Sequence, residues 1–232
     1  GARVHLLCNP QNPTGTVLRP AELLALAELA ERHGVLVVAD EIHAPLTRVG
    51  VSFTPFASLD HPAARRAVTL VSASKAWNLA GLKCALLLAG PDGGRELLAA
   101  VPHEVTLGAS LFGQLATEAA LDGGRPWLEE LRDYLDAGLD RLGRLLAEHL
   151  PQVRWQRPEG TYLAWLDCRG VATGGPPGSE GEPTTRFLDR GRVSLGAGLD
   201  FGPEGAGHVR LTTAVPHPVL DEIVRRMSTA GG

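Results

Sequence analysis

The most constraining feature of this chain is a short apolar run that passes directly into a polar turn, a pattern that occurs four times. These runs occupy residues 3–8, 35–39, 67–71 and 84–89. They are predominantly apolar rather than strictly alternating, which is typical of strands in a sheet covered on both faces. A helical pattern separates the first two runs, beginning at Pro20 and ending at Gly34. The sequence therefore predicts an α/β fold.

The pattern changes from residue 111 onward. Helices are expected over residues 111–121 and from Pro126 to about residue 150. The later segments predict a smaller α+β domain, with strands at 161–166 and 208–212, helices around Phe187 and from Pro218, and a mobile Gly/Pro-rich loop over 170–183. We expect a partial large domain over residues 1–125, and a connecting helix with the small C-terminal domain over 126–232.

Composition excludes several classes of protein. The chain of 232 residues is 44% hydrophobic and carries a net charge of −4, which favours an ordinary soluble globular protein over a nucleic-acid binder. No apolar run approaches the ~20 residues that span a bilayer. The three cysteines show no C-x-x-C spacing, so neither a disulfide framework nor a metal site is expected. We predict a cytoplasmic protein with no nucleic-acid or membrane partner.

Lysine is nearly absent from this arginine-rich chain. Of the 22 basic residues, only Lys75 and Lys83 are lysines. Arg stays protonated and forms no imine, whereas a deprotonated Lys attacks carbonyl carbons. Retained lysines therefore indicate positions that need an amine.

Three candidate site residues follow predicted strands directly. Asn12, Asp40 and Lys75 each lie just beyond an apolar run. Ligands of open α/β sheets bind beyond the carboxyl ends of the strands. These three side chains can therefore converge although they are distant in sequence.

Four motifs in register carry a family resemblance, namely Asn9-Pro10-Gln11-Asn12-Pro13-Thr14-Gly15, Asp40-Glu41-Ile42-His43, Ser72-Ala73-Ser74-Lys75 through Lys83, and His208-Val209-Arg210-Leu211. In this order and spacing the chain resembles the class I/II aminotransferases, enzymes of the aspartate aminotransferase fold (fold type I) that depend on pyridoxal 5'-phosphate (PLP). The match covers nearly the whole chain and is far more specific than any one motif.

The resemblance implies a role for Lys75 and for the residues around the cofactor phosphate. Lys75 matches the lysine that binds PLP covalently and then moves the substrate Cα proton. The hydroxyls of Ser72 and Ser74 match phosphate donors, and Lys83 matches the basic phosphate ligand.

Further positions match contacts to the cofactor ring and the substrate. Asp40 corresponds to the carboxylate that pairs with the pyridinium nitrogen and sustains the electron sink. Asn12 resembles the residue that donates a hydrogen bond to the phenolic oxygen of PLP. Arg210 corresponds to the arginine that clamps the carboxylate of an amino-acid substrate, a bidentate task suited to guanidinium.

The Asp40-to-His43 motif is similar to that of the cystathionine β-lyase and carbon–sulfur lyase branch of the MalY/PatB type. His43 is a candidate cofactor contact and equally a candidate structural residue. The branch implies α,β-elimination on cysteine S-conjugates, giving pyruvate, ammonia and a thiol. A class I/II aminotransferase is the alternative, and pyruvate release without an added keto acid separates the two.

Family members carry an N-terminal half that has no counterpart in this sequence. We therefore expect a fragment with exposed apolar sheet edges, derived from a protein that is a homodimer at full length. A third hypothesis is an inactive fragment or a non-catalytic ligand-binding domain, although no helix-turn-helix or basic patch accompanies it.

Overall fold

A computed structural model describes residues 1–171 and 182–231. Its contacts divide the chain into two compact units. Unit 1 comprises Gly1–Gln11, Thr16–Leu131 and Glu159–Thr161, and unit 2 comprises Asn12–Gly15, Arg132–Pro158 and Tyr162–Gly232. The predicted loop over 170–183 lies largely outside the described residues.

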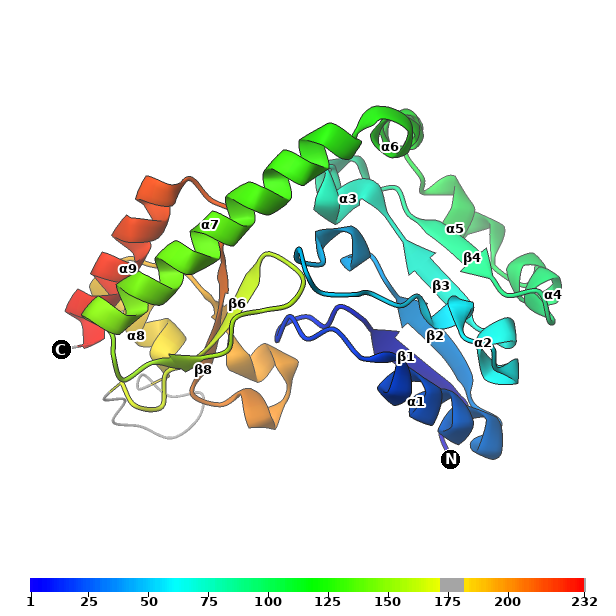
Figure 1. The fold of residues 1–232 in the computed structure, drawn as a ribbon, viewed down its shortest axis with the longest axis horizontal. Coiled ribbons are helices and arrows are strands. Elements are labelled where there is room, and N and C mark those ends of the chain that lie inside the picture. Colours follow the sequence, from blue (N-terminus) through cyan, green and yellow to red (C-terminus); the bar gives the residue numbers. More distant parts are fainter. Residues whose placement is uncertain (172–181, 232) are drawn as a thin grey trace. The chain divides into compact units, whose positions relative to one another are not determined.

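Unit 1 is built on one sheet of four strands. The strands are β1 (Val4–Cys8), β2 (Leu36–Asp40), β3 (Val68–Val71) and β4 (Leu86–Ala89), and they lie side by side in that order (Figure 1). The first three are parallel, with Cys8 opposite Asp40 and Asp40 opposite Leu70, whereas β4 is antiparallel. The carboxyl ends of β1, β2 and β3 therefore meet at one edge of the sheet.

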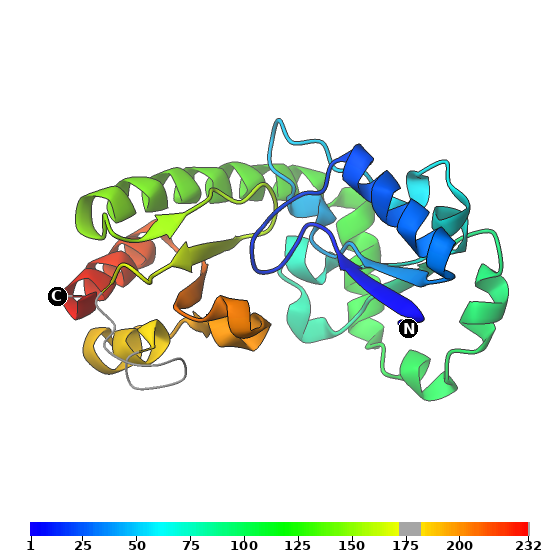
Figure 2. The same ribbon diagram turned by 90° about the horizontal axis from the view of Figure 1, so that it is seen from below.

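The core of unit 1 lies between this sheet and the helices α1 (Pro20–His33) and α2 (Pro62–Arg66). Both views show α1 alongside β1 (Figures 1 and 2). Proline at the first position starts α1, and Gly34 ends it with a left-handed φ of 63°. The predicted helix therefore has the predicted ends. Its apolar stripe contributes Leu23, Ala27 and Ala30 to the core.

The remaining helices of unit 1 are α3 (Ala73–Ala76), α4 (Gly94–Ala99), α5 (His103–Leu107) and α6 (Leu111–Gly123). Coverage of both sheet faces is not found among the described residues, because Leu6 is 76% exposed and Leu86, Leu87 and Leu88 are all exposed. The α/β class is confirmed. The expectation of two covered faces is wrong for β1 and β4, since α1 and α2 pack on only one face.

Unit 2 contains a second sheet covered by helices. Its strands are β5 (Arg154–Trp155), β6 (Leu163–Asp167), β7 (Gly196–Ala197) and β8 (His208–Thr212), in the antiparallel order β5-β6-β8-β7. The helices are α7 (Arg125–His149), which belongs to this unit from Arg132 onward, α8 (Pro183–Gly191) and α9 (His217–Gly231). Alternate residues of β6 and β8, such as Leu166 and Val209, pack with Leu142, Phe187 and Val224 in the core.

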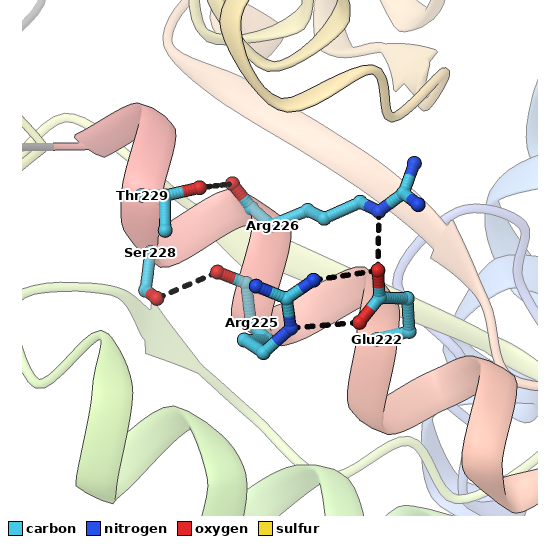
Figure 3. Close-up of polar contacts among 5 residues, drawn as sticks. All are labelled: Glu222, Arg225, Arg226, Ser228 and Thr229. Carbon is cyan, nitrogen blue, oxygen red and sulfur yellow. Dashed lines mark hydrogen bonds and ion pairs between the residues drawn. The ribbon is translucent and has the colours of Figure 1, made fainter.

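The solvent side of α9 is held by its own polar contacts. Glu222 accepts hydrogen bonds from Arg225 and Arg226, and the hydroxyls of Ser228 and Thr229 each donate to a backbone carbonyl of the preceding turn (Figure 3). The two guanidinium groups lower the pKa of Glu222 to about 2. Within the described ranges, no helix is both long enough and apolar enough to cross a membrane.

Candidate active site

A closed loop follows β1 and carries the Asn-Pro motif. The Asn9 side-chain oxygen accepts the Leu18 N–H at 3.0 Å, and the Glu159 carboxylate accepts the Val17 N–H at 3.2 Å and pairs with Arg19. Asn9 is 1% exposed. The sequence analysis did not identify Glu159 as a residue that holds this loop. The one sequence feature that could have pointed to it is its position directly before Gly160 and Thr161. These contacts position the part of the loop that bears Asn12.

Asn12 and Arg210 meet within unit 2. The Arg210 Nη1 on β8 donates to the Asn12 Oδ1 at 3.0 Å, and its guanidinium lies 4.9 Å from the Phe201 ring centre. Burial raises the pKa of the nearby Tyr162, although the Arg210 charge opposes this shift. The phenol is therefore protonated at neutral pH, and Arg210 is held between an amide oxygen and an aromatic face.

The end of β2 carries two adjacent carboxylates in different environments. The Asp40 Oδ1 accepts the Ile42 N–H at 3.2 Å. Glu41 is buried, and its Oε1 accepts the Phe56 N–H at 2.7 Å. Burial raises the pKa of Glu41, and the neighbouring Asp40 adds to the shift. Asp40 is the half-buried carboxylate at the strand end. It is therefore the better placed of the two to meet a cationic ligand.

His43 lies one turn beyond Asp40. It is 5% exposed and precedes the short helix Ala44–Leu46. This burial fits a side chain that supports the strand end.

The Ser72-to-Lys75 segment turns from β3 into α3. The Ser72 hydroxyl accepts the Ser74 N–H at 3.0 Å and donates to the Cys84 carbonyl at 2.6 Å. Ser74 and Lys75 are half-buried, whereas Lys83 is exposed with a left-handed φ of 50°. Because β2 and β3 are adjacent and parallel, Asp40 and the Ser72–Lys75 segment share one sheet edge.

The structure therefore gathers the predicted site residues in two groups. Asp40, Ser72, Ser74 and Lys75 follow neighbouring strands of unit 1, and Asn12 and Arg210 form a pair in unit 2. The first group offers an amine for a carbonyl carbon, hydroxyls for a phosphate, and a carboxylate for a protonated ring nitrogen, and the exposed Lys83 nearby in the sequence is the candidate cation. This donor chemistry fits PLP.

Comparisons with known proteins give the family. The model of the family described as "Aminotransferase class I and II" matches residues 2–227. A Mycobacterium tuberculosis (strain H37Rv) protein named "Putative cystathionine beta-lyase" is 47% identical, and "Cystathionine beta-lyase PatB" of Bacillus subtilis is 36% identical; each match covers 98% of this chain and 58% of the relative. The chain thus spans less than two thirds of the length of these relatives.

A solved structure shows the same fold. The PLP-bound C–S lyase from Staphylococcus hominis superposes with a TM-score of 0.87 at 28% identity, over 99% of this chain and 58% of that one.

Proposed function

Because this chain belongs to the aminotransferase class I and II family, we propose that the protein is a PLP-dependent C–S β-lyase acting on cysteine S-conjugates such as cystathionine. The observation that carries the proposal is the Asp40–Glu41–Ile42–His43 strand end beside the Ser72–Lys75 turn. The cystathionine β-lyase relatives at 36–47% identity support it. The products are a thiol, pyruvate and ammonia.

PLP, when bound, supplies an aldehyde that takes up the amino group and a ring that withdraws electrons from Cα. Lys75 would hold the cofactor through Nζ and, once the substrate amino group has displaced it there, the released Lys75 amine would take the substrate Cα proton at Nζ, which weakens the Cβ–S bond. Asp40 holds a proton on the ring nitrogen. The sulfur leaves from Cβ with the bonding pair.

The two serines before Lys75 take different roles. The single Ser72 hydroxyl hydrogen is directed to the Cys84 carbonyl, so Ser72 acts by shaping the turn. Among the described residues the Ser74 hydroxyl has no such bond, which makes Ser74 the phosphate donor, with Lys83 as the cation. His43 supports the strand end from its buried position.

The Asn12–Arg210 pair serves the substrate and the cofactor oxygen. Arg210 binds the substrate α-carboxylate through its guanidinium. Asn12 accepts from Arg210 through its oxygen, and its NH₂ is the group that would donate to the phenolic oxygen of PLP.

Pyruvate formation tests this proposal. The full-length protein, loaded with PLP and given L-cystathionine without a keto acid, is expected to release pyruvate and thiol in equal amounts, and Lys75→Ala removes both. Product formation only with an added keto acid supports the aminotransferase instead. PLP binding without either reaction supports the non-catalytic alternative.

We also propose that the full-length form is a cytoplasmic homodimer. Apolar side chains exposed on unit 1, including Phe112 and Leu115, support a covered surface. The three free cysteines, Cys8, Cys84 and Cys168, support a reducing compartment. Light scattering of the full-length protein reports the mass, and a monomer contradicts the first part of this proposal.

A further inference from the structure

A cavity of about 240 Å³ opens on the outer face of the unit 2 sheet. Trp165 and His208 form its aromatic wall, and Arg154 and Asp167 supply charge at its rim. Because side chains alternate along a strand, Ala164 and Leu166 face the core while Trp165 and Asp167 face the cavity. The volume exceeds the ~150 Å³ that accepts benzene in an engineered apolar cavity.

An aromatic row connects this cavity to Arg210. Trp165 stacks on His208 with ring centres 5.2 Å apart and planes at 8°, and it meets Phe201 edge-on at 5.6 Å. Phe201 in turn lies under the Arg210 guanidinium at 4.9 Å. The cavity wall is thus a preformed, rigid aromatic surface.

Of the charged side chains at the cavity rim, Asp167 is paired within the protein, and the Arg154 guanidinium can bind a ligand. Asp167 accepts two side-chain bonds from Arg169, at 2.8 and 2.7 Å, and this pairing lowers the pKa of Asp167 to about 2. Arg154 lies opposite Asp167 in the β5–β6 register, yet within the described ranges its guanidinium has no hydrogen bond or ion pair. The cavity therefore suits an aromatic group that carries an anion.

The register of β6 and β8 determines how far the cavity lies from Arg210 along the strands. Trp165 lies opposite Arg210, and Asp167 lies opposite His208. Two residues along a strand span about 6.6 Å, which is the order of length that a Cα–Cβ–S–C chain covers. A substrate whose α-carboxylate is held by Arg210 can therefore place its sulfur substituent over Trp165 and His208.

We propose that this cavity binds the leaving-group end of the substrate, and that the preferred substrates are cysteine S-conjugates whose sulfur carries an aromatic ring with a carboxylate. The inference rests on the proposed lyase function. Trp165 and His208 contact the ring, and Arg154 pairs with the distal carboxylate.

Binding of a leaving-group mimic tests the cavity without any turnover. The probe is 4-methylbenzoate, titrated against the tryptophan fluorescence of the full-length protein with and without PLP. We expect saturable quenching, at least tenfold weaker binding of the uncharged 4-methylbenzamide, and at least tenfold weaker 4-methylbenzoate binding by Arg154→Gln. Arg190→Gln removes an equally exposed cation from α8 and is expected to leave binding unchanged. Equal binding of the two probes overturns the proposal.

Substrate preference tests the assignment to the leaving group. The value of kcat/KM for S-(4-carboxybenzyl)-cysteine is expected to exceed that for S-benzylcysteine at least tenfold, and Arg154→Gln is expected to bring the ratio near one. A ratio near one in the unaltered enzyme overturns this role even if 4-methylbenzoate binds. Failure of 4-methylbenzoate binding with cystathionine cleavage intact rejects the cavity and leaves the lyase. Binding without any elimination rejects the lyase, and with it the leaving-group role.

Discussion

The Arg210 Nη1 lies 3.0 Å from the Asn12 Oδ1, so that β8 is hydrogen-bonded directly to the Asn-Pro loop, 198 residues away in the chain. A guanidinium held by an amide oxygen on one side and the Phe201 ring at 4.9 Å is fixed in orientation before any ligand arrives. Such preorganisation reduces the ordering cost of binding a carboxylate.

Arg210→Lys tests this arrangement. An ammonium retains the charge but loses the planar fork and the stacking on Phe201. Because a hydrogen bond to a charged group contributes about 1.5–3 kcal/mol, we expect KM for cystathionine to rise at least about tenfold in steady-state assays. Arg190→Lys on α8 is the matched control. An unchanged KM in Arg210→Lys would mean that the substrate carboxylate binds elsewhere.

The two serines before Lys75 are expected to respond differently to alanine. Ser72→Ala removes the bonds to the Cys84 carbonyl and the Ser74 N–H, so the free energy of unfolding should fall by about 1–2 kcal/mol. Ser74→Ala should leave stability within about 0.5 kcal/mol and weaken PLP binding. Urea unfolding and PLP titration by absorbance measure the two effects, and the reverse pattern would exchange the two roles.

Gly160 is required by its close approach to the Asn-Pro loop. A Cβ at this position would lie 2.7 Å from the Pro10 Cβ and 2.9 Å from its Cγ. Gly160→Ala should therefore destabilise the protein by about 1–3 kcal/mol. Gly123→Ala, at the end of α6 where nothing lies within 4 Å, is the control and should be neutral or slightly stabilising. Equal effects of the two substitutions on urea unfolding would refute the crowding argument.

Cys168 should make stability fall at alkaline pH. Burial raises the pKa of its thiol to about 12, whereas the unfolded chain has a cysteine pKa of about 8.5. Above that value the unfolded state binds fewer protons, so the free energy of unfolding decreases as pH rises. From pH 8.5 to 10 the loss due to Cys168 is about 2 kcal/mol. Unfolding of Cys168→Ala over the same interval should lose about 2 kcal/mol less, and parallel curves would disprove the shift.

Elements with local signals could be predicted from the sequence. Pro20 and Gly34 bound α1 because a proline fits the first turn and a glycine adopts the left-handed cap. The strand-end positions of Asp40 and Lys75 followed from apolar runs, since parallel strands end at a common edge. Their roles came from motifs in register and stay predictions.

Features that depend on pairing between distant segments could not be predicted in this way. The antiparallel direction of β4 and the exposure of Leu6 arise from packing that no local window encodes. The Trp165–His208 stack depends on the β6–β8 register. The hydrogen bond from the Ser72 hydroxyl to the Cys84 carbonyl also depends on how these two segments pack, so it could not be predicted from the sequence.

The central claim is that Lys75 is the amine that bonds PLP, and borohydride reduction tests it most directly. The full-length protein is incubated with PLP, reduced, and analysed by intact mass and peptide mapping. Lys83 is the other lysine among these 232 residues, so the assignment within this segment is unambiguous. We predict a single adduct on the Lys75 peptide that is lost in Lys75→Ala, with circular dichroism showing that the variant folds. An adduct on Lys83 alone, or no adduct on a folded protein, would contradict the account.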